Sequence, residues 1–180
     1  MKLVGLSGNL AGWKTNVVVH KVLTAAKAVD KDIKTELVDL RDYEVEFVNG
    51  SPLAYYNDDT WDVVNKITSA DLLVIGTPIY QASISGALKN VLDHLPVDAL
   101  KGKVTGMVAT AGSHNHFLVP EYQLKPILSY LKGIVPATSV YIQDDAFDDV
   151  NEIVDENVSE RIQKFAEELV SLQKSISEKK

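Results

Sequence analysis

The stretch LSGNLAGWKTN, residues 6–16, contains residue types that hold phosphate in other proteins. Its glycines, hydroxyls and amides follow a short apolar run and precede a helical pattern that begins at Lys14. The start of a helix offers free backbone N–H groups and the positive end of the helix dipole, and Lys14 adds a charge. The stretch is therefore a candidate site for one monophosphate. The side chains that can donate hydrogen bonds to it are Ser7, Asn9, Thr15 and Asn16.

The spacing of the glycines disfavours two familiar nucleotide-binding motifs. A Walker A loop has four residues between its glycines and a lysine directly after the second one. Here three residues separate Gly8 from Gly12, and Trp13 stands between Gly12 and Lys14. The dinucleotide fingerprint G-x-G-x-x-G does not fit Gly5, Gly8 and Gly12 either.

A helix cap is the competing interpretation of the same stretch. Thr15 or Asn16 would then cap the helix, and Ser7 would close a turn. The residues of this stretch alone leave phosphate binding and capping equally open.

A second loop, in the stretch GTPIYQASISG, residues 76–86, shifts the balance towards a ligand. Pro78 restrains the loop, while Ile79 and Tyr80 offer an apolar and an aromatic surface beside backbone N–H groups. Such a surface can hold a flat heteroaromatic ring by its polar edge. The alternative is that Ile79 and Tyr80 only pack on the rim of the sheet.

A third loop, ATAGSHNHF, residues 109–117, has Gly112 and Ser113 where a backbone could approach a ligand closely. His114 and His116 lie nearby, but two histidines without a third ligand make a poor metal site. We therefore expect no metal. We also assign no catalytic acid, base or nucleophile, because no Ser-His-Asp arrangement is discernible.

These loops must be positioned by the strands and helices around them. Strand-like runs occupy residues 2–8, 34–40, 71–78, 103–112 and 137–143, and helical patterns occupy 14–29, 59–69, 84–95, 120–131 and 152–172. This alternation predicts an α/β fold, a five-stranded parallel sheet with helices on both faces. Ligands of such sheets bind beyond the carboxyl ends of the strands, where the three loops fall.

The composition limits the classes of function. The chain has 180 residues, a net charge of −7, no cysteine and only two arginines. The absence of a basic stripe argues against nucleic-acid binding, and no apolar run approaches the roughly 20 residues that cross a membrane. We expect a cytoplasmic protein without disulfides.

Two patterns are more specific. Residues 78–89 read P-x-Y-x-x-S-x-S-G-x-L-K, and residues 122–128 read Y-x-L-K-P-x-L. Both resemble the NAD(P)H-dependent FMN reductase family, most closely the reductases that supply reduced FMN to alkanesulfonate monooxygenases. The resemblance extends from residue 2 to about residue 147. It implies a flavodoxin-like, FMN-binding fold. The length predicts a single domain over residues 1–180, and the charged residues at the end predict a frayed tail over 173–180.

The resemblance also implies which residues would meet FMN. Ser7, Asn9, Thr15 and Asn16 would hold its phosphate, and Lys14 would supply the charge of an arginine that the family's loop carries and this loop lacks. The isoalloxazine ring would be lined by Pro78, Ile79, Tyr80, Gln81 and Ser83, and its far edge by Thr110, Ala111, Gly112 and Ser113.

Tyr122 has a separate argument. It lies about 200° round the helix from the buried stripe that starts at Leu124, so it is off that stripe. In the resembling reductases a tyrosine at this place accompanies a π-bulge at the tetramer interface near the flavin, which implies a homodimer or homotetramer here. The alternative is an exposed surface tyrosine.

The expected activity is hydride transfer from NADPH or NADH to FMN. The reduced flavin would pass to a monooxygenase, or would reduce a quinone, an azo dye or a metal oxyanion. Two alternatives stay open: a flavodoxin-like electron carrier without NAD(P)H oxidase activity, and a sulfur- or nucleotide-binding module that has lost flavin.

Overall fold

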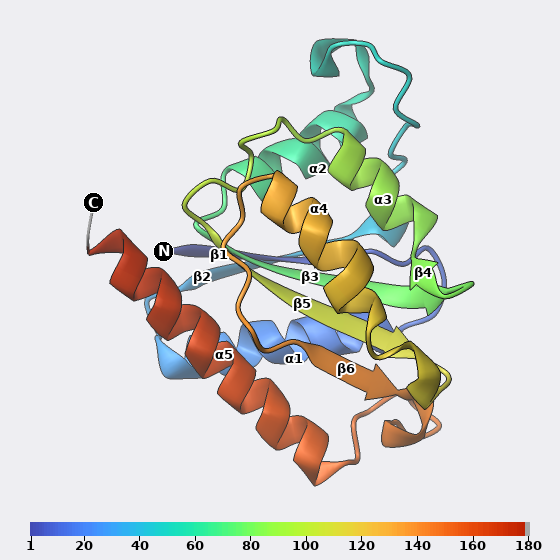
Figure 1. Ribbon diagram of the computed structural model, residues 1–180, viewed down its shortest axis with the longest axis vertical. Helices are drawn as coiled ribbons and strands as arrows, with labels where there is room; N and C mark the ends of the chain where they lie inside the picture. Colours follow the sequence, from blue (N-terminus) through green and yellow to red (C-terminus); the bar gives the residue numbers. More distant parts are fainter. Residues whose placement is uncertain (179–180) are drawn as a thin grey trace.

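Five parallel strands form the central sheet, in the order β2-β1-β3-β5-β6 (Figure 1). The computed structural model describes residues 1–178. The strands are β1 (Lys2–Ser7), β2 (Lys34–Asp39), β3 (Leu72–Tyr80), β5 (Val104–Ala111) and β6 (Val140–Gln143). The predicted five-stranded parallel sheet is confirmed. A short antiparallel strand, β4 (Ser83–Ile84), pairs with the end of β3 and was not predicted.

Helices cover both faces of the sheet, as predicted (Figure 1). One face packs against α1 and α5, and the other against α2, α3 and α4. Their bounds are α1 (Lys14–Val29), α2 (Asp58–Thr68), α3 (Gly86–Asp93), α4 (Lys125–Tyr130) and α5 (Glu156–Ser177). Within residues 1–178, no helix is both long and apolar enough to span a membrane.

The alternation of side chains along the strands builds two separate cores. In β3, Leu72 and Val74 contribute to the core under α1 and α5, whereas Leu73 and Ile75 contribute to the core under α2, α3 and α4. Successive side chains of a strand point to opposite faces, so a continuous apolar run buries both faces of the sheet.

Several helix boundaries differ from the expected ones, as at α3 and α5. The helix expected from residue 84 begins at Gly86, because Ile84 pairs with β3 and the Ser85 side chain caps the helix by accepting from the Leu88 N–H at 3.0 Å. The last helix begins at Glu156 and continues to Ser177, beyond the expected end at residue 172. Gln173 is buried and accepts from the Val104 N–H at 2.7 Å. The expected frayed tail is therefore helical through residue 177, and residues 179–180 lie outside the described part.

The topology brings the three loops to one edge of the sheet. The strand order reverses between β1 and β3, so the loops that follow these strands diverge there and leave a crevice. Gly76 lets α1 lie close against the sheet beside this point, since a Cβ there would stand 2.4 Å from Val19 Cγ2. The amino end of α1 is thereby held at the crevice.

Candidate functional site

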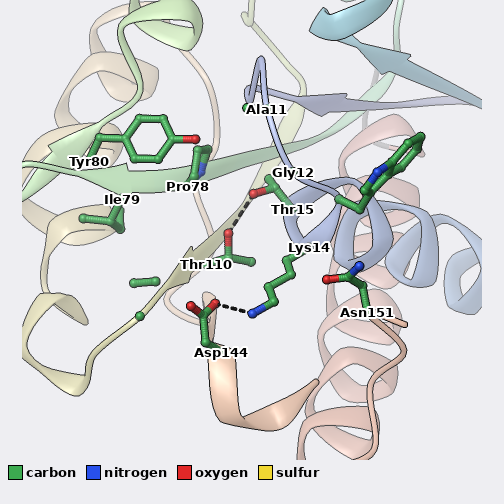
Figure 2. A pocket seen from close by; sticks show the side chains of 13 residues that line it. Ala11, Gly12, Lys14, Thr15, Pro78, Ile79, Tyr80, Thr110, Asp144 and Asn151 are labelled. Carbon is green, nitrogen blue, oxygen red and sulfur yellow. Dashed lines mark hydrogen bonds and ion pairs between the residues drawn. The ribbon is translucent and has the colours of Figure 1, made fainter. Parts of the chain in front are cut away.

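A cavity of about 240 Å³ lies beyond the carboxyl ends of β1, β3 and β5 (Figure 2). It brings together parts of all three predicted loops. The lining residues are Ala11, Gly12, Trp13, Lys14, Thr15, Pro78, Ile79, Tyr80, Thr110, Ala111, Gly112, Asp144 and Asn151. Of the predicted site residues, Ser7, Asn9, Asn16, Gln81, Ser83, Ser113 and Tyr122 do not line it.

The amino end of α1 opens into this cavity without a cap. Trp13 stands at the N-cap position, and no side chain in the described part of the chain caps this helix. The first turn carries no acidic residue, and its first N–H groups have no carbonyl partner within the helix. The alternative in which Thr15 or Asn16 caps the helix is therefore wrong. N–H groups without a partner in the helix, together with the helix dipole, favour an anion here.

Ser7 and Asn9 stabilise the loop from inside. Both are buried, and the Ser7 hydroxyl donates to Asn9 Oδ1 at 2.5 Å. The Asn9 amide donates to the carbonyls of Ala11, at 3.1 Å, and Gly12, at 2.9 Å. Their donors are therefore committed to the loop itself, which gives these two residues a shaping role in this structure.

Thr15 and Asn16 point in different directions. Thr15 Oγ1 lies 2.7 Å from Thr110 Oγ1, and this buried pair joins α1 to β5 at the floor of the cavity (Figure 2). Asn16 instead donates its amide to the Asp39 carboxylate at the end of β2. Thr15 therefore belongs to the cavity, and Asn16 belongs to a neighbouring group of residues.

That neighbouring group centres on an ion pair between Asp39 and Arg41. Burial acts to raise the pKa of Asp39, but hydrogen bonds from Arg41 and Asn16 outweigh it and hold this pKa below its ordinary 3.8. The pair therefore stabilises the fold above that pH, and the stabilisation is lost as the pH falls through the lowered pKa. Sequence reasoning missed Arg41. Its position two residues after β2 could have indicated it, because the carboxyl end of β2 lies at the same edge of the sheet as the three loops.

Lys14 reaches across the cavity to Asp144, with Nζ 2.9 Å from Oδ1 (Figure 2). Its Nζ also lies 5.3 Å from the centroid of the Phe147 ring. Asp144 follows β6, outside the three loops that the sequence predicted for the site. The positive charge predicted for this site is therefore present and shared with a carboxylate.

The second loop is a tight hairpin between β3 and β4. Ile79 lines the cavity beside Tyr80, which is half exposed, and both extend from the same strand (Figure 2). At the hairpin tip Gln81 has a φ of 47° and Ala82 a φ of 58°, a pair of left-handed residues typical of two-residue hairpin turns. Ile79 and Tyr80 therefore do more than pack on the sheet rim, since they form one wall of the cavity.

Gln123 fastens this hairpin to the segment before α4. Its amide donates to the Ala82 carbonyl at 2.9 Å, and its side-chain oxygen accepts from the Ser83 hydroxyl. Ser83 therefore faces Gln123 rather than the cavity. The sequence analysis selected Tyr122 in this segment and did not select the adjacent Gln123.

The segment Pro120–Leu124 is π-helical, as the resemblance implied. The Lys125 N–H donates to the Pro120 carbonyl, five residues earlier, which is the hydrogen bond of a π-turn. Tyr122 lies on its outer side and is 74% exposed. In the single chain it lies outside the cavity lining.

The third loop contributes backbone more than side chains. Thr110, Ala111 and Gly112 border the cavity, and a Cβ on Gly112 would lie 3.4 Å from Asp144 Oδ2. Beyond them the Tyr141 hydroxyl donates to the Ser113 carbonyl and holds the loop against β6. His114 contacts Gln143.

Comparisons with known proteins identify the family of this chain. Residues 1–147 match the family described as NADPH-dependent FMN reductase. A NAD(P)H-dependent FAD/FMN reductase of Geobacillus thermodenitrificans is 46% identical over 176 residues, which cover 98% of this chain and 95% of that protein.

Two solved structures add to this. The apo form of an NADH:FMN oxidoreductase, EmoB, is 26% identical, with a TM-score of 0.74 over 93% of this chain and 89% of that one. An archaeal flavodoxin, 8% identical, has a TM-score of 0.69 over 97% and 99% of the two chains, which confirms the predicted flavodoxin-like fold. The chain belongs to the NADPH-dependent FMN reductase family.

Proposed function

We propose that this NAD(P)H-dependent FMN reductase holds the FMN phosphate at the amino end of α1 and the isoalloxazine ring against the β3–β4 hairpin. The observation that carries the proposal is the uncapped first turn of α1, which opens into a cavity formed at the ends of three strands. A helix start that is left without a cap beside a cavity is suited to an anionic ligand.

The polar end of the cavity fits a phosphate ester. Lys14 supplies a positive charge, and the N–H groups of the first helical turn supply donors. The Asp144 carboxylate forms an ion pair with the Lys14 ammonium. Because the ammonium compensates the negative charge of Asp144, this carboxylate repels a bound phosphate less. We propose that Thr15, beside Thr110, borders the phosphate, while Ser7 and Asn9 keep the loop in shape.

The apolar side fits a flat ring. Pro78, Ile79 and Tyr80 provide one wall, and the backbone of residues 110–112 provides the other. A bound FMN supplies hydride chemistry, because its ring accepts a hydride from a reduced nicotinamide. The residues named here would bind the ring, orient it and exclude water from one of its faces.

We propose further that the reduced flavin serves a monooxygenase or a small acceptor. We also propose that the chain forms a homodimer or homotetramer. Phe117, Leu118 and Tyr122 support association, since these large apolar side chains are exposed near one another along the chain. Sedimentation velocity of the purified protein measures the number of subunits.

The test of the function is a titration followed by reduction. Purified protein is titrated with FMN while flavin fluorescence is recorded, and NADPH or NADH is then added without oxygen. We expect FMN to bind and its visible absorbance to bleach with at least one nucleotide. Bound flavin that stays yellow with both nucleotides would favour an electron carrier. If FMN does not bind, the chain is a module that has lost flavin.

The hairpin wall yields a first mutational prediction. Gln123→Ala removes two hydrogen bonds that hold a turn in which Gln81 and Ala82 both have positive φ, a strained conformation for such residues. We expect the Kd for FMN and the Kd for riboflavin to rise together, by about threefold to tenfold. Both flavins carry the ring, so both should lose the same contact.

A second substitution serves as the control for this prediction. Ala82→Gly removes the steric penalty of a positive φ, so in the Gln123→Ala background it should restore part of the affinity for both flavins. Fluorescence titration of wild type, Gln123→Ala and the double variant with both flavins gives the six Kd values. Unchanged affinity of Gln123→Ala for both flavins would show that the hairpin does not wall the ring.

A further inference from the structure

Arg41 connects the end of β2 to the loop before α1. Its Nη1 donates to the Gly12 carbonyl at 2.9 Å, and its guanidinium carbon lies 3.6 Å from the centroid of the Trp13 ring. It therefore contacts the last two residues before the helix, although it lies 29 positions after Gly12 along the chain. A planar guanidinium can stack on an indole and donate in its own plane at the same time.

Asp39 fixes the orientation of this guanidinium. Arg41 Nε lies 3.0 Å from both carboxylate oxygens of Asp39, and Nη2 also donates to one of them. The Arg41 backbone N–H donates to the same carboxylate at 3.1 Å, and Asn16 donates to it from α1. Both charged side chains are largely buried, so the guanidinium has little freedom to turn.

The residues that Arg41 contacts set the direction of the first turn of α1. Gly12 has a φ of 77°, which reverses the chain just before the helix, and Trp13 follows as the N-cap residue. No atom lies within 4 Å of the position that a Cβ on Gly12 would take. Steric crowding therefore does not force Gly12 into its positive φ. The Gly12 carbonyl accepts from both the Asn9 amide and Arg41 Nη1, each at 2.9 Å. Arg41 is the partner that also stacks on Trp13, so it restrains both residues before the helix.

We propose that Arg41 is a positioning residue for the phosphate site: it holds Gly12 and Trp13 so that the N–H groups of the first turn of α1 face the phosphate of FMN. The proposal rests on the proposed function, in which that phosphate lies at this helix end. The charge of Arg41 is compensated by Asp39, so its contribution is mainly geometric. Lysine cannot replace it, because a single ammonium cannot keep the stack and the in-plane hydrogen bonds together.

The experiment compares FMN with riboflavin, which has the same ring and lacks the phosphate. In the wild-type protein, FMN should bind more tightly than riboflavin. In Arg41→Lys, we expect this preference to fall by about tenfold, the equivalent of one hydrogen bond to a charged group, while the Kd for riboflavin stays within about twofold. A purely structural role would weaken the binding of both flavins equally.

Three further variants keep the result interpretable. Arg161→Lys is the matched control, because Arg161 is the other arginine and contacts the Tyr141 carbonyl, and it should keep the wild-type preference. Trp13→Leu removes the stack from a side chain that is 60% exposed, so it should fold and lose about threefold of the preference. Trp13→Phe retains an aromatic face for the guanidinium and should therefore keep the wild-type preference for FMN over riboflavin.

The possible failures are distinguishable. If wild-type protein binds riboflavin as tightly as FMN, the proposed phosphate site itself is wrong. If wild-type protein prefers FMN and both Arg41→Lys and Trp13→Leu keep the full preference, Arg41 does not position the site. An equal loss for both flavins in Arg41→Lys, with no change of preference in Trp13→Leu, would also overturn the proposal.

Discussion

Gly8→Ala will lower the free energy of unfolding by about 3 kcal/mol and will abolish FMN binding at micromolar protein. A Cβ at this position would lie 2.8 Å from the Gly76 carbonyl oxygen and 2.8 Å from Leu88 Cβ. Neither atom can swing away as the end of a long side chain could. The Gly8 N–H also donates to that same carbonyl at 2.8 Å, so relief of the clash would break this hydrogen bond and displace the loop from β3.

Urea denaturation of both proteins measures the loss of stability, and fluorescence titration measures FMN binding. Gly86→Ala is the control, because a Cβ on Gly86, the first residue of α3, would meet nothing within 4 Å. It should leave stability unchanged or raise it by up to about 1 kcal/mol, since alanine favours the helix. A Gly8→Ala protein within 1 kcal/mol of wild type would show that the loop tolerates a shift.

The fold could be predicted because its signals are local. The run LLVI at the start of β3 buries alternate residues on opposite faces, and the helical spacing of Val158, Ile162, Phe165 and Leu169 marks one buried stripe of α5. Such periodicity is visible in a single segment. The short strand β4 escaped prediction because the apolar spacing of Ile84 fits a helix equally well, and pairing with Ile79 decided the outcome.

The region of the site could also be predicted, since parallel strands bring their carboxyl ends to one edge. The direction of each side chain could not. Asn16 is adjacent to Thr15, yet it turns to Asp39, and Lys14 turns to Asp144, because their partners come from distant strands. Arg41 was missed for the same reason, as its contact with Gly12 spans 29 residues. A hydrogen-bond donor in a loop shows that the side chain can bind a ligand. Which group it binds depends on the residues that the folded chain places beside it.

Lys14→Glu will weaken FMN binding by about 100-fold, or about 2.7 kcal/mol, and will leave riboflavin binding nearly unchanged. The FMN phosphate carries between one and two negative charges, and the substitution turns a nearby positive charge into a negative one. Stability should change little. A carboxylate in the first turn of α1 interacts well with the helix dipole, which offsets the lost ion pair with Asp144.

Asp144→Asn provides the opposite test of the same electrostatics. The amide no longer holds the Lys14 ammonium, which is 2.9 Å from the carboxylate in the structure, and the site loses one negative charge. We therefore expect FMN to bind several-fold more tightly, again with little change for riboflavin. Opposite shifts in the two variants, both confined to FMN, would locate the phosphate beside Lys14. If FMN and riboflavin shift together, or if neither variant changes FMN affinity, the phosphate lies elsewhere and the amino end of α1 has another role.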